Sequence, residues 1–260
     1  MASETVNFEI IDGVGRIALN RPKVFNSFNQ EMSKACHAAL DACQKDDSVR
    51  AIFLTGEGKA FCAGQDLGEA IDPNGPDIKR IVEEHYNPLI LRLRKIEKPI
   101  VCAVNGVAAG AGANVALACD IVVAKSSSVF VQAFSSIGLI PDSGGTFMLP
   151  RLIGWQKASA LMMLADKVDG QEAERLGMIY KCFDDDGFEE QAWKIAQKLS
   201  KMPTTGLGLT KRLLNASYHN SLEKQLSYEG EIQVLAAATS DFQEGVNAFL
   251  EKRKPKFTGK

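Results

Sequence analysis

The segment that decides the fold is IVCAVNGVAAGAGAN, residues 100–114. Its first five residues are apolar or small, a short run typical of a buried strand. Asn105 and Gly106 then break the run. Small residues continue from about Gly110 to Ala118, which predicts a helix packed closely against its neighbours. We therefore expect a strand, a tight turn and a small-residue helix.

A second segment with the same plan lies upstream. Residues 51–67 are AIFLTGEGKAFCAGQDL, in which an apolar run over residues 51–55 is followed by the small pair Ala63 and Gly64. Small residues let the backbone approach another group closely. For either segment alone two interpretations stay open. The glycines either permit tight turns and close packing, or they expose backbone N–H groups to a ligand oxygen.

The composition narrows the class of protein. The chain has 260 residues, of which 45% are hydrophobic and 24% charged, enough for one large domain or a domain with a helical appendage. A net charge of −2 gives no reason to expect a nucleic-acid partner. Six cysteines form no Cys-x-x-Cys pair, which predicts a reduced compartment and no metal site. No secretory leader or membrane span is apparent, so we expect a cytoplasmic protein.

Strands and helices are expected to alternate along the first 187 residues, which indicates a largely parallel sheet. The expected elements are a hairpin around Asp12 and Gly13, a helix capped by Asn29, a strand over residues 51–55, a loop over residues 64–77, one helix from Asp77 to Lys98, and strands over residues 100–104, 121–124 and 129–131.

After Asp186 the pattern becomes helical. Helices are expected over residues 188–201, 204–219, 222–239 and 241–252. The sequence therefore predicts an α/β core over residues 1–187 and a helical C-terminal subdomain over residues 188–260.

Residues 100–114 and 51–67, together with GLIPDSGGT over residues 138–146, resemble the crotonase (enoyl-CoA hydratase/isomerase) superfamily. The likeness extends from about Val6 to Phe257. It implies a crotonase-like spiral of ββα units and chemistry on acyl-CoA thioesters, with coenzyme A as part of the substrate and no separate cofactor. It also implies that the amides of Gln65 and Ala111 bind the thioester oxygen, and that the CoA path is lined by Ala63, Asp66, Leu67 and Gly68. Two such donors stabilise a developing oxyanion. Taken alone, Asp66 is more typical of a loop-capping carboxylate.

The resemblance also identifies the acid. Hydratases of the superfamily use two glutamates, and this chain has Asn114 and Phe134 at those positions. Asp142 instead falls where several isomerases of the superfamily, and the chlorobenzoyl-CoA dehalogenases, keep a catalytic carboxylate. Apolar neighbours are expected to raise its pKa. The alternative is that Asp142 caps a helix that begins at Gly144 or Gly145.

Within the superfamily, residues 133–146 most resemble the ring-1,2-epoxyphenylacetyl-CoA isomerases. This implies conversion of a ring epoxide to an oxepin, double-bond shifts in unsaturated acyl-CoAs, or both. Three alternatives stay open: a hydratase-type lyase, a dehalogenase-like hydrolase that uses His85 to activate water, and an acyl-CoA binder without activity.

The C-terminal helix resembles the final helix of the superfamily, in which a lysine and an aromatic residue bind coenzyme A of a neighbouring subunit. Lys252 and Phe249 match those positions. The resemblance implies a homotrimer, commonly paired into a hexamer, whose contacts come from a helical trimerisation subdomain. The alternative is a solvated basic helix end.

Overall fold

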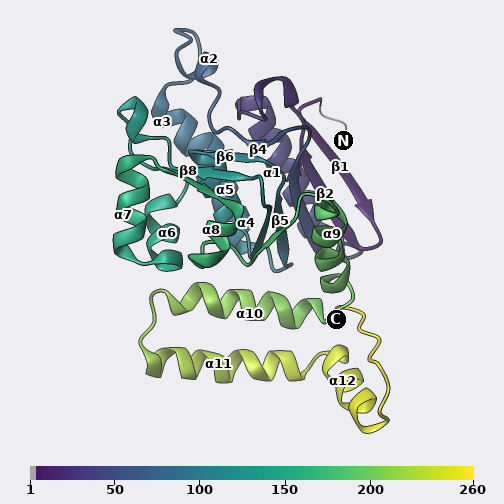
Figure 1. Ribbon diagram of the computed structural model, residues 1–260. Helices are drawn as coiled ribbons and strands as arrows, with labels where there is room; N and C mark the ends of the chain where they lie inside the picture. The colour runs from purple at the N-terminus through teal and green to yellow at the C-terminus, as the bar shows by residue number, and fades with distance from the viewer. Residues whose placement is uncertain (1–3) are drawn as a thin grey trace.

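The computed structural model describes residues 4–260. It contains two β-sheets, whose strands alternate along much of the chain (Figure 1). The six-stranded sheet has the order β1 (Val6–Ile11), β2 (Val14–Leu19), β3 (Ala51–Gly56), β5 (Ile100–Val104), β7 (Ile121–Lys125) and β10 (Lys181–Phe183). The four-stranded sheet has the order β4 (Ala60–Cys62), β6 (Val107–Ala109), β8 (Val129–Val131) and β9 (Lys167–Asp169). Only β1 with β2 and β8 with β9 pair antiparallel among these described strands.

Three consecutive strand pairs build both sheets. In β3–β4, β5–β6 and β7–β8, the first strand extends the large sheet and the second extends the small one. Each new pair lies parallel to the previous pair. This is the predicted spiral of ββα units.

Helices pack around the two sheets and, near the end of the chain, extend beyond them (Figure 1). They are α1 (Gln30–Lys45), α2 (Leu67–Ala70), α3 (Ile78–Arg80), α4 (Asn87–Lys95), α5 (Ala111–Leu117), α6 (Gly145–Ile153), α7 (Trp155–Leu164), α8 (Gly170–Arg175), α9 (Phe188–Leu199), α10 (Thr204–Ser217), α11 (Leu222–Ala237) and α12 (Ser240–Leu250). Short 3₁₀ turns span η1 (Pro22–Val24) and η3 (Ser135–Ile137), and a π-helical segment, η2 (Ile81–Tyr86), links α3 to α4.

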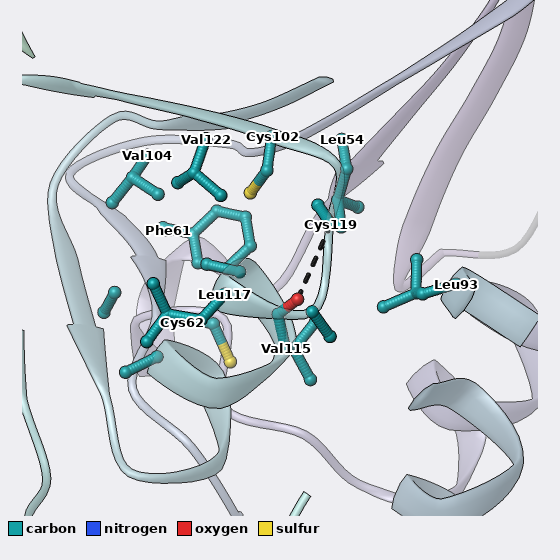
Figure 2. Packing of buried hydrophobic residues seen from close by; sticks show 14 of the residues in the cluster. Leu54, Phe61, Cys62, Leu93, Cys102, Val104, Val115, Leu117, Cys119 and Val122 are labelled. Atoms are coloured by element: carbon teal, nitrogen blue, oxygen red, sulfur yellow. Dashed lines mark hydrogen bonds between the residues drawn. The ribbon is translucent and has the colours of Figure 1, made fainter. Parts of the chain in front are cut away.

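Helix α5 is buried between the sheets and α4. Figure 2 shows Val115 and Leu117 of α5 among Phe61 of the small sheet and residues of the large sheet. A Cβ atom on Gly112 would overlap the carbonyl of Cys62, so the helix can lie against β4 only because this residue is glycine. The close packing that the small residues of this helix predicted is confirmed.

Helix α9 covers the other face of the large sheet. Phe188, Ala192 and Ala196 of α9 are buried against Phe53 and Val101 of the sheet. Helices α10 and α11 form a pair beyond the core, with α12 at the end of the chain (Figure 1). The division at residue 188 stays a prediction, and the packing of α9 associates this helix with the sheet.

Most expected elements are confirmed, with two corrections. The helix expected over residues 77–98 is continuous from Ile78 but ends at Lys95, and a π-helical segment, η2, joins its α-helical parts α3 and α4. Pro88 has no N–H to donate to the preceding turn, so a regular α-helical ladder cannot cross it. The expected loop over residues 64–77 contains the short helix α2, which is capped by Asp66. In the part of the chain described, no helix is long and apolar enough to cross a bilayer.

A buried ion pair attaches α10 to the core. The Nζ atom of Lys211 lies 2.8 Å from an Asp120 carboxylate oxygen, and the Lys211 side chain is only 6% exposed. Asp120 also lies 3.6 Å from Arg94 and accepts a hydrogen bond from the Ile100 amide. Removing one partner of a buried pair leaves the other charge poorly compensated.

We expect Lys211→Ala to lower the free energy of unfolding by about 3 kcal/mol, because Asp120 stays buried with a weaker partner. Arg212→Ala is the matched control on the same helix. Its pair with Glu97 is 39% and 44% exposed, so a loss below about 1 kcal/mol is expected. Urea unfolding of both variants measures the difference, and equal losses would contradict the assigned role of Lys211.

Candidate active site

A cavity of about 200 Å³ opens where the ends of β4 and β6 face η2 and the segment before α6. Its lining is mostly apolar and contains only three polar side chains among the described residues, those of Gln65, Tyr86 and Asp142. The other lining residues are Ala63, Gly64, Leu67, Ala70, Ile78, Ile81, Val82, Gly110, Ala111, Ala133, Phe134, Ile137 and Leu139. Such a cavity suits an apolar group with one polar reacting centre.

Parallel pairing of β4 with β6 brings the two loops together. Ala60 is in register with Val107 and Cys62 with Ala108, so both strands end at the same edge of the sheet. The loops are in direct contact, because a Cβ atom on Gly64 would lie 2.9 Å from the Ala109 oxygen and 3.6 Å from the Ala111 nitrogen. Gly64 also has a positive φ of 95°, which favours glycine there.

At this edge, the backbone amides of the cavity-lining residues Gln65 and Ala111 have no acceptor among residues 4–260. The peptides on both sides of Gln65 are fixed by Phe28, whose N–H donates to Gly64 and whose carbonyl accepts from Asp66. Ala111 is the first residue of α5, where an N–H has no partner within the helix. Both amides can therefore donate to an oxygen in the cavity.

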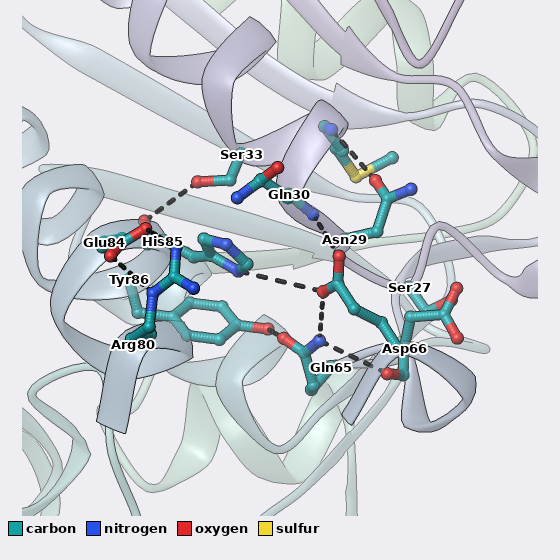
Figure 3. A network of polar contacts seen from close by, with 12 residues as sticks. Ser27, Asn29, Gln30, Ser33, Gln65, Asp66, Arg80, Glu84, His85 and Tyr86 are labelled. Atoms are coloured by element: carbon teal, nitrogen blue, oxygen red, sulfur yellow. Dashed lines mark hydrogen bonds and ion pairs between the residues drawn. The ribbon is translucent and has the colours of Figure 1, made fainter. Parts of the chain in front are cut away.

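The side chain of Gln65 is held from both ends (Figure 3). The Tyr86 hydroxyl donates to its Oε1 atom at 3.0 Å, and its Nε2 atom donates to Glu69 at 2.8 Å. Glu69 in turn accepts from the Gln30 amide at 2.8 Å. Tyr86 is completely buried, so this network fixes the loop that carries the Gln65 amide.

His85 is a neighbour of this network and does not line the cavity (Figure 3). It is 1% exposed, its ring lies 3.9 Å from Glu69, and burial lowers its pKa. The dehalogenase-like alternative needs a histidine that activates water at the reacting centre. Among the described lining residues there is no histidine, so the structure gives that alternative no support.

Asp142 lines the cavity together with the two loops and is half-buried. Burial raises the pKa of its carboxyl above the ordinary value, and a hydrogen bond from Ser143 Oγ at 2.9 Å partly offsets this effect. The alternative role as a helix cap is wrong. Helix α6 begins at Gly145 after a left-handed Gly144, and no side chain caps its first turn within the described structure.

The two positions that the family resemblance assigns to hydratase glutamates are occupied by Asn114 and Phe134, whose side chains cannot transfer protons. Asn114 is buried and hydrogen-bonded to the backbone of Asp142. Phe134 lines the cavity, with its ring close to Gly110. Asp142 is therefore the one carboxylate among the described lining residues.

The other expected site residues fall into two groups. Ala63 and Leu67 line the cavity, whereas Asp66 and Gly68 do not. Asp66 forms an ion pair with Arg21 at 2.9 Å and accepts from the Gly68 amide at 3.0 Å, the capping role that its residue type suggested. A contact of Asp66 or Gly68 with coenzyme A stays a prediction.

Phe249 and Lys252 lie at the end of α12, far from the cavity of the same chain (Figure 1). Phe249 is 84% exposed. Neither residue lines the cavity of its own chain, and their contact with coenzyme A stays a prediction.

Sequence reasoning missed the wall formed by Ile78, Ile81, Val82 and Tyr86. The residues follow Asp77 in an amphipathic stretch, but nothing in the sequence indicates which loop this stretch faces. No cluster of three or more possible metal ligands occurs within residues 4–260.

Comparison with known proteins identifies the family. A model of the enoyl-CoA hydratase/isomerase family matches residues 9–260. The chain is 48% identical over 251 residues to 1,2-epoxyphenylacetyl-CoA isomerase of Escherichia coli, covering 95% of this chain and 96% of the relative. It is 33% identical to 2,3-dehydroadipyl-CoA hydratase of Escherichia coli, with 94% of each chain covered. The crystal structure of an enoyl-CoA hydratase/isomerase from Cupriavidus metallidurans superposes with a TM-score of 0.92 at 31% identity, over 100% of this chain and 98% of that one.

The chain thus belongs to the enoyl-CoA hydratase/isomerase family, and the expected crotonase fold is confirmed. It is an enzyme of the hydratase/isomerase type, and members of this family act on acyl-CoA substrates.

The raised pKa of Asp142 predicts a pH-dependent effect on stability. The folded protein binds this proton more tightly than the unfolded chain, whose carboxyl has the ordinary value of 3.8. The contribution of Asp142 to stability therefore falls as the pH rises through the folded-state pKa. Because Asn is uncharged, we expect Asp142→Asn to be more stable than the parent protein at neutral pH, with the gain disappearing below about pH 4.

Urea unfolding at a series of pH values measures this gain. Asp185→Asn is the control of opposite sign, because hydrogen bonds from Ser127 and Ser126 lower the pKa of Asp185. It should lose stability at neutral pH. A less stable Asp142→Asn protein at neutral pH would show that the ionised carboxylate is not disfavoured by burial.

Proposed function

We propose that the protein isomerises acyl-CoA thioesters, with Asp142 as the single proton carrier and the amides of Gln65 and Ala111 as oxyanion donors. One observation carries this proposal: one cavity contains a carboxylate with a raised pKa and two amides without acceptors. The neutral residues at the two hydratase positions, Asn114 and Phe134, support isomerisation over the addition of water.

The geometry supports a proton shuttle. The thioester carbonyl oxygen accepts hydrogen bonds from the two amides, while Asp142 takes a proton from the carbon next to the carbonyl. The electron pair of the broken C–H bond moves into the carbonyl, and the resulting enolate oxygen is stabilised by both donors. For a 3-enoyl thioester, the carboxyl then returns the proton to C4, so that the double bond ends between C2 and C3. A carboxylate whose pKa is raised toward neutrality suits both transfers.

For the substrate we propose the ring-1,2-epoxide of phenylacetyl-CoA, with unsaturated linear acyl-CoAs as further substrates. The supporting findings are the 48% identity to the Escherichia coli isomerase of that name and the apolar cavity beside Tyr86 and Phe134. Coenzyme A enters as part of the substrate, and the proposed chemistry needs no further cofactor.

A homotrimer, or a hexamer of two trimers, completes the proposal. Helices α11 and α12 expose large apolar side chains, including Leu222, Val234, Phe249 and Leu250 at 69–84%. Apolar surface of this extent is typical of an interface. In such an assembly Phe249 and Lys252 bind the coenzyme A portion in the cavity of a neighbouring subunit.

We expect Asp142→Asn to fold and to lose about 10²–10⁴-fold in turnover, the range typical of general acid–base catalysis. The assay compares a 3-enoyl-CoA, a 2-enoyl-CoA in water and the phenylacetyl-CoA epoxide. Asp185→Asn, far from the cavity lining, should keep full activity. An active Asp142→Asn protein would remove the carboxylate from the mechanism, and turnover of the 2-enoyl-CoA alone would favour a hydratase.

The donor at residue 111 can be tested by deleting one N–H group. Ala111 occupies the first position of α5, where proline is tolerated. We expect Ala111→Pro to lower kcat about 10²–10³-fold, the usual effect of losing one oxyanion donor. Ala111→Gly keeps the N–H and should stay within about threefold of the parent rate. Equal activity of the two variants would show that this amide does not bind the substrate oxygen.

A further inference from the structure

Asn114, at one of the two positions that the resemblance assigns to a hydratase glutamate, is buried, and its side-chain amide both donates and accepts a hydrogen bond inside the protein. We propose that Asn114, supported by Gln132, is a positioning residue that holds Asp142 at a fixed place relative to the Ala111 amide. This inference rests on the proposed function, in which Asp142 carries the proton.

The contacts of Asn114 define its orientation. Its Nδ2 atom donates to the Asp142 carbonyl at 2.9 Å, and its Oδ1 atom accepts from Gln132 Nε2 at 2.8 Å. The Gly145 amide donates to the same carbonyl at 2.9 Å. The opposite orientation of the Asn114 amide would place its oxygen against the Asp142 carbonyl oxygen, so the donor set fixes which atom faces Asp142. The hydrogen bonds from Asn114 and from the Gly145 amide thus hold the backbone carbonyl of Asp142 in place.

One helix connects this contact to the oxyanion donor. Ala111 is the first residue of α5 and Asn114 is its fourth. Asn114 is three steps along the helix from Ala111, a rise of about 4.5 Å that a regular helix keeps constant. Because Asn114 binds the Asp142 backbone, helix α5 positions both the Ala111 amide and the residue that carries the carboxylate.

The surroundings of Asn114 fit an amide and exclude a larger acid. Asn114 and Gln132 are 1% and 2% exposed. A Cβ atom on Gly145 would overlap the Asn114 side chain, so the two residues are already in tight contact. A glutamate at position 114 would need space for one more methylene and would provide no N–H for the Asp142 carbonyl.

The hydrogen bonding of Gln132 is a second observation that supports a positioning role for Asn114. Its Oε1 atom is buried without a hydrogen-bond partner in the described part of the chain, while its Nε2 atom serves Asn114. A buried polar atom without a partner is unfavourable, so a residue that only filled space would be better served by an apolar side chain. The amide of Gln132 is therefore used as a donor that orients Asn114.

Asn114→Ala tests the inference in the 3-enoyl-CoA assay. Because a misplacement of about 1 Å can lower a rate about 10²-fold, we expect kcat to fall about 10–100-fold while KM changes by less than about threefold. Gln132→Ala, which acts through Asn114, should lower kcat by a smaller factor. Ser128→Ala is the matched control, because it removes another buried donor to a backbone carbonyl, that of Val104, outside the cavity lining.

A double variant separates positioning from packing. Asn114→Ala with Gly145→Ala refills part of the lost volume but does not restore the bond to Asp142. We expect its thermal midpoint to rise above that of Asn114→Ala while kcat stays low. Recovery of kcat together with the midpoint would assign Asn114 a packing role and overturn the inference.

Parallel measurement of Asp142→Asn separates this inference from the proposed function. Full turnover by Asp142→Asn would refute both. An inactive Asp142→Asn protein beside Asn114→Ala and Gln132→Ala proteins with parental kcat would refute the positioning role alone. Should Asn114→Ala fail to fold, the decrease in kcat expected for Gln132→Ala still decides the question.

Discussion

The parallel pairing of β4 with β6 is the constraint on which the site depends. These two short strands end at one edge of the small sheet, and each is followed by a loop with a free backbone amide. The pairing exists because β3 and β5 lie parallel in the large sheet, and each is followed directly in the chain by a strand of the small sheet, β4 or β6. Gly64 and Gly112 then allow contacts that any side chain would block. The position of the two amides in the cavity is thus a consequence of the spiral fold.

The two amides are held in place by hydrogen bonds and by a helix, whereas the rest of the cavity lining is mostly apolar. Tyr86 and Glu69 hold the Gln65 loop, and α5 holds Ala111 at its first residue. Burial raises the pKa of Asp142, which suits the proposed proton transfer and lowers the stability of the folded protein at neutral pH. Asn114 connects the Ala111 amide with Asp142, because it belongs to α5 and donates to the Asp142 carbonyl.

The sequence predicted those parts of the fold that have long or distinctive local patterns. The hairpin, the Asn29 cap, the strands β3, β5, β7 and β8, and the C-terminal helices were all predicted, because each has a clear periodicity or cap. The strands β4, β6, β9 and β10 have only three residues each, too few to show a period, whereas the equally short β8 consists of the residues Val129, Phe130 and Val131, which are typical of strands. The division of residues 77–95 into three helical pieces depends on Pro88 and on packing against α1, which local preference does not reveal. Likewise the cavity wall and the contact between Asn114 and Asp142 join residues far apart in the chain, so only tertiary structure reveals them.

The central claim is that one carbonyl oxygen binds between the amides of Gln65 and Ala111 while Asp142 faces the adjacent carbons. A crystal structure of the protein with a stable acyl-CoA analogue tests this claim most directly. The account predicts that the thioester oxygen lies about 2.7–3.1 Å from both amide nitrogens, with the Asp142 carboxylate next to the neighbouring carbon. A thioester bound with its oxygen away from these amides, or with Asp142 turned out of the cavity, would contradict it.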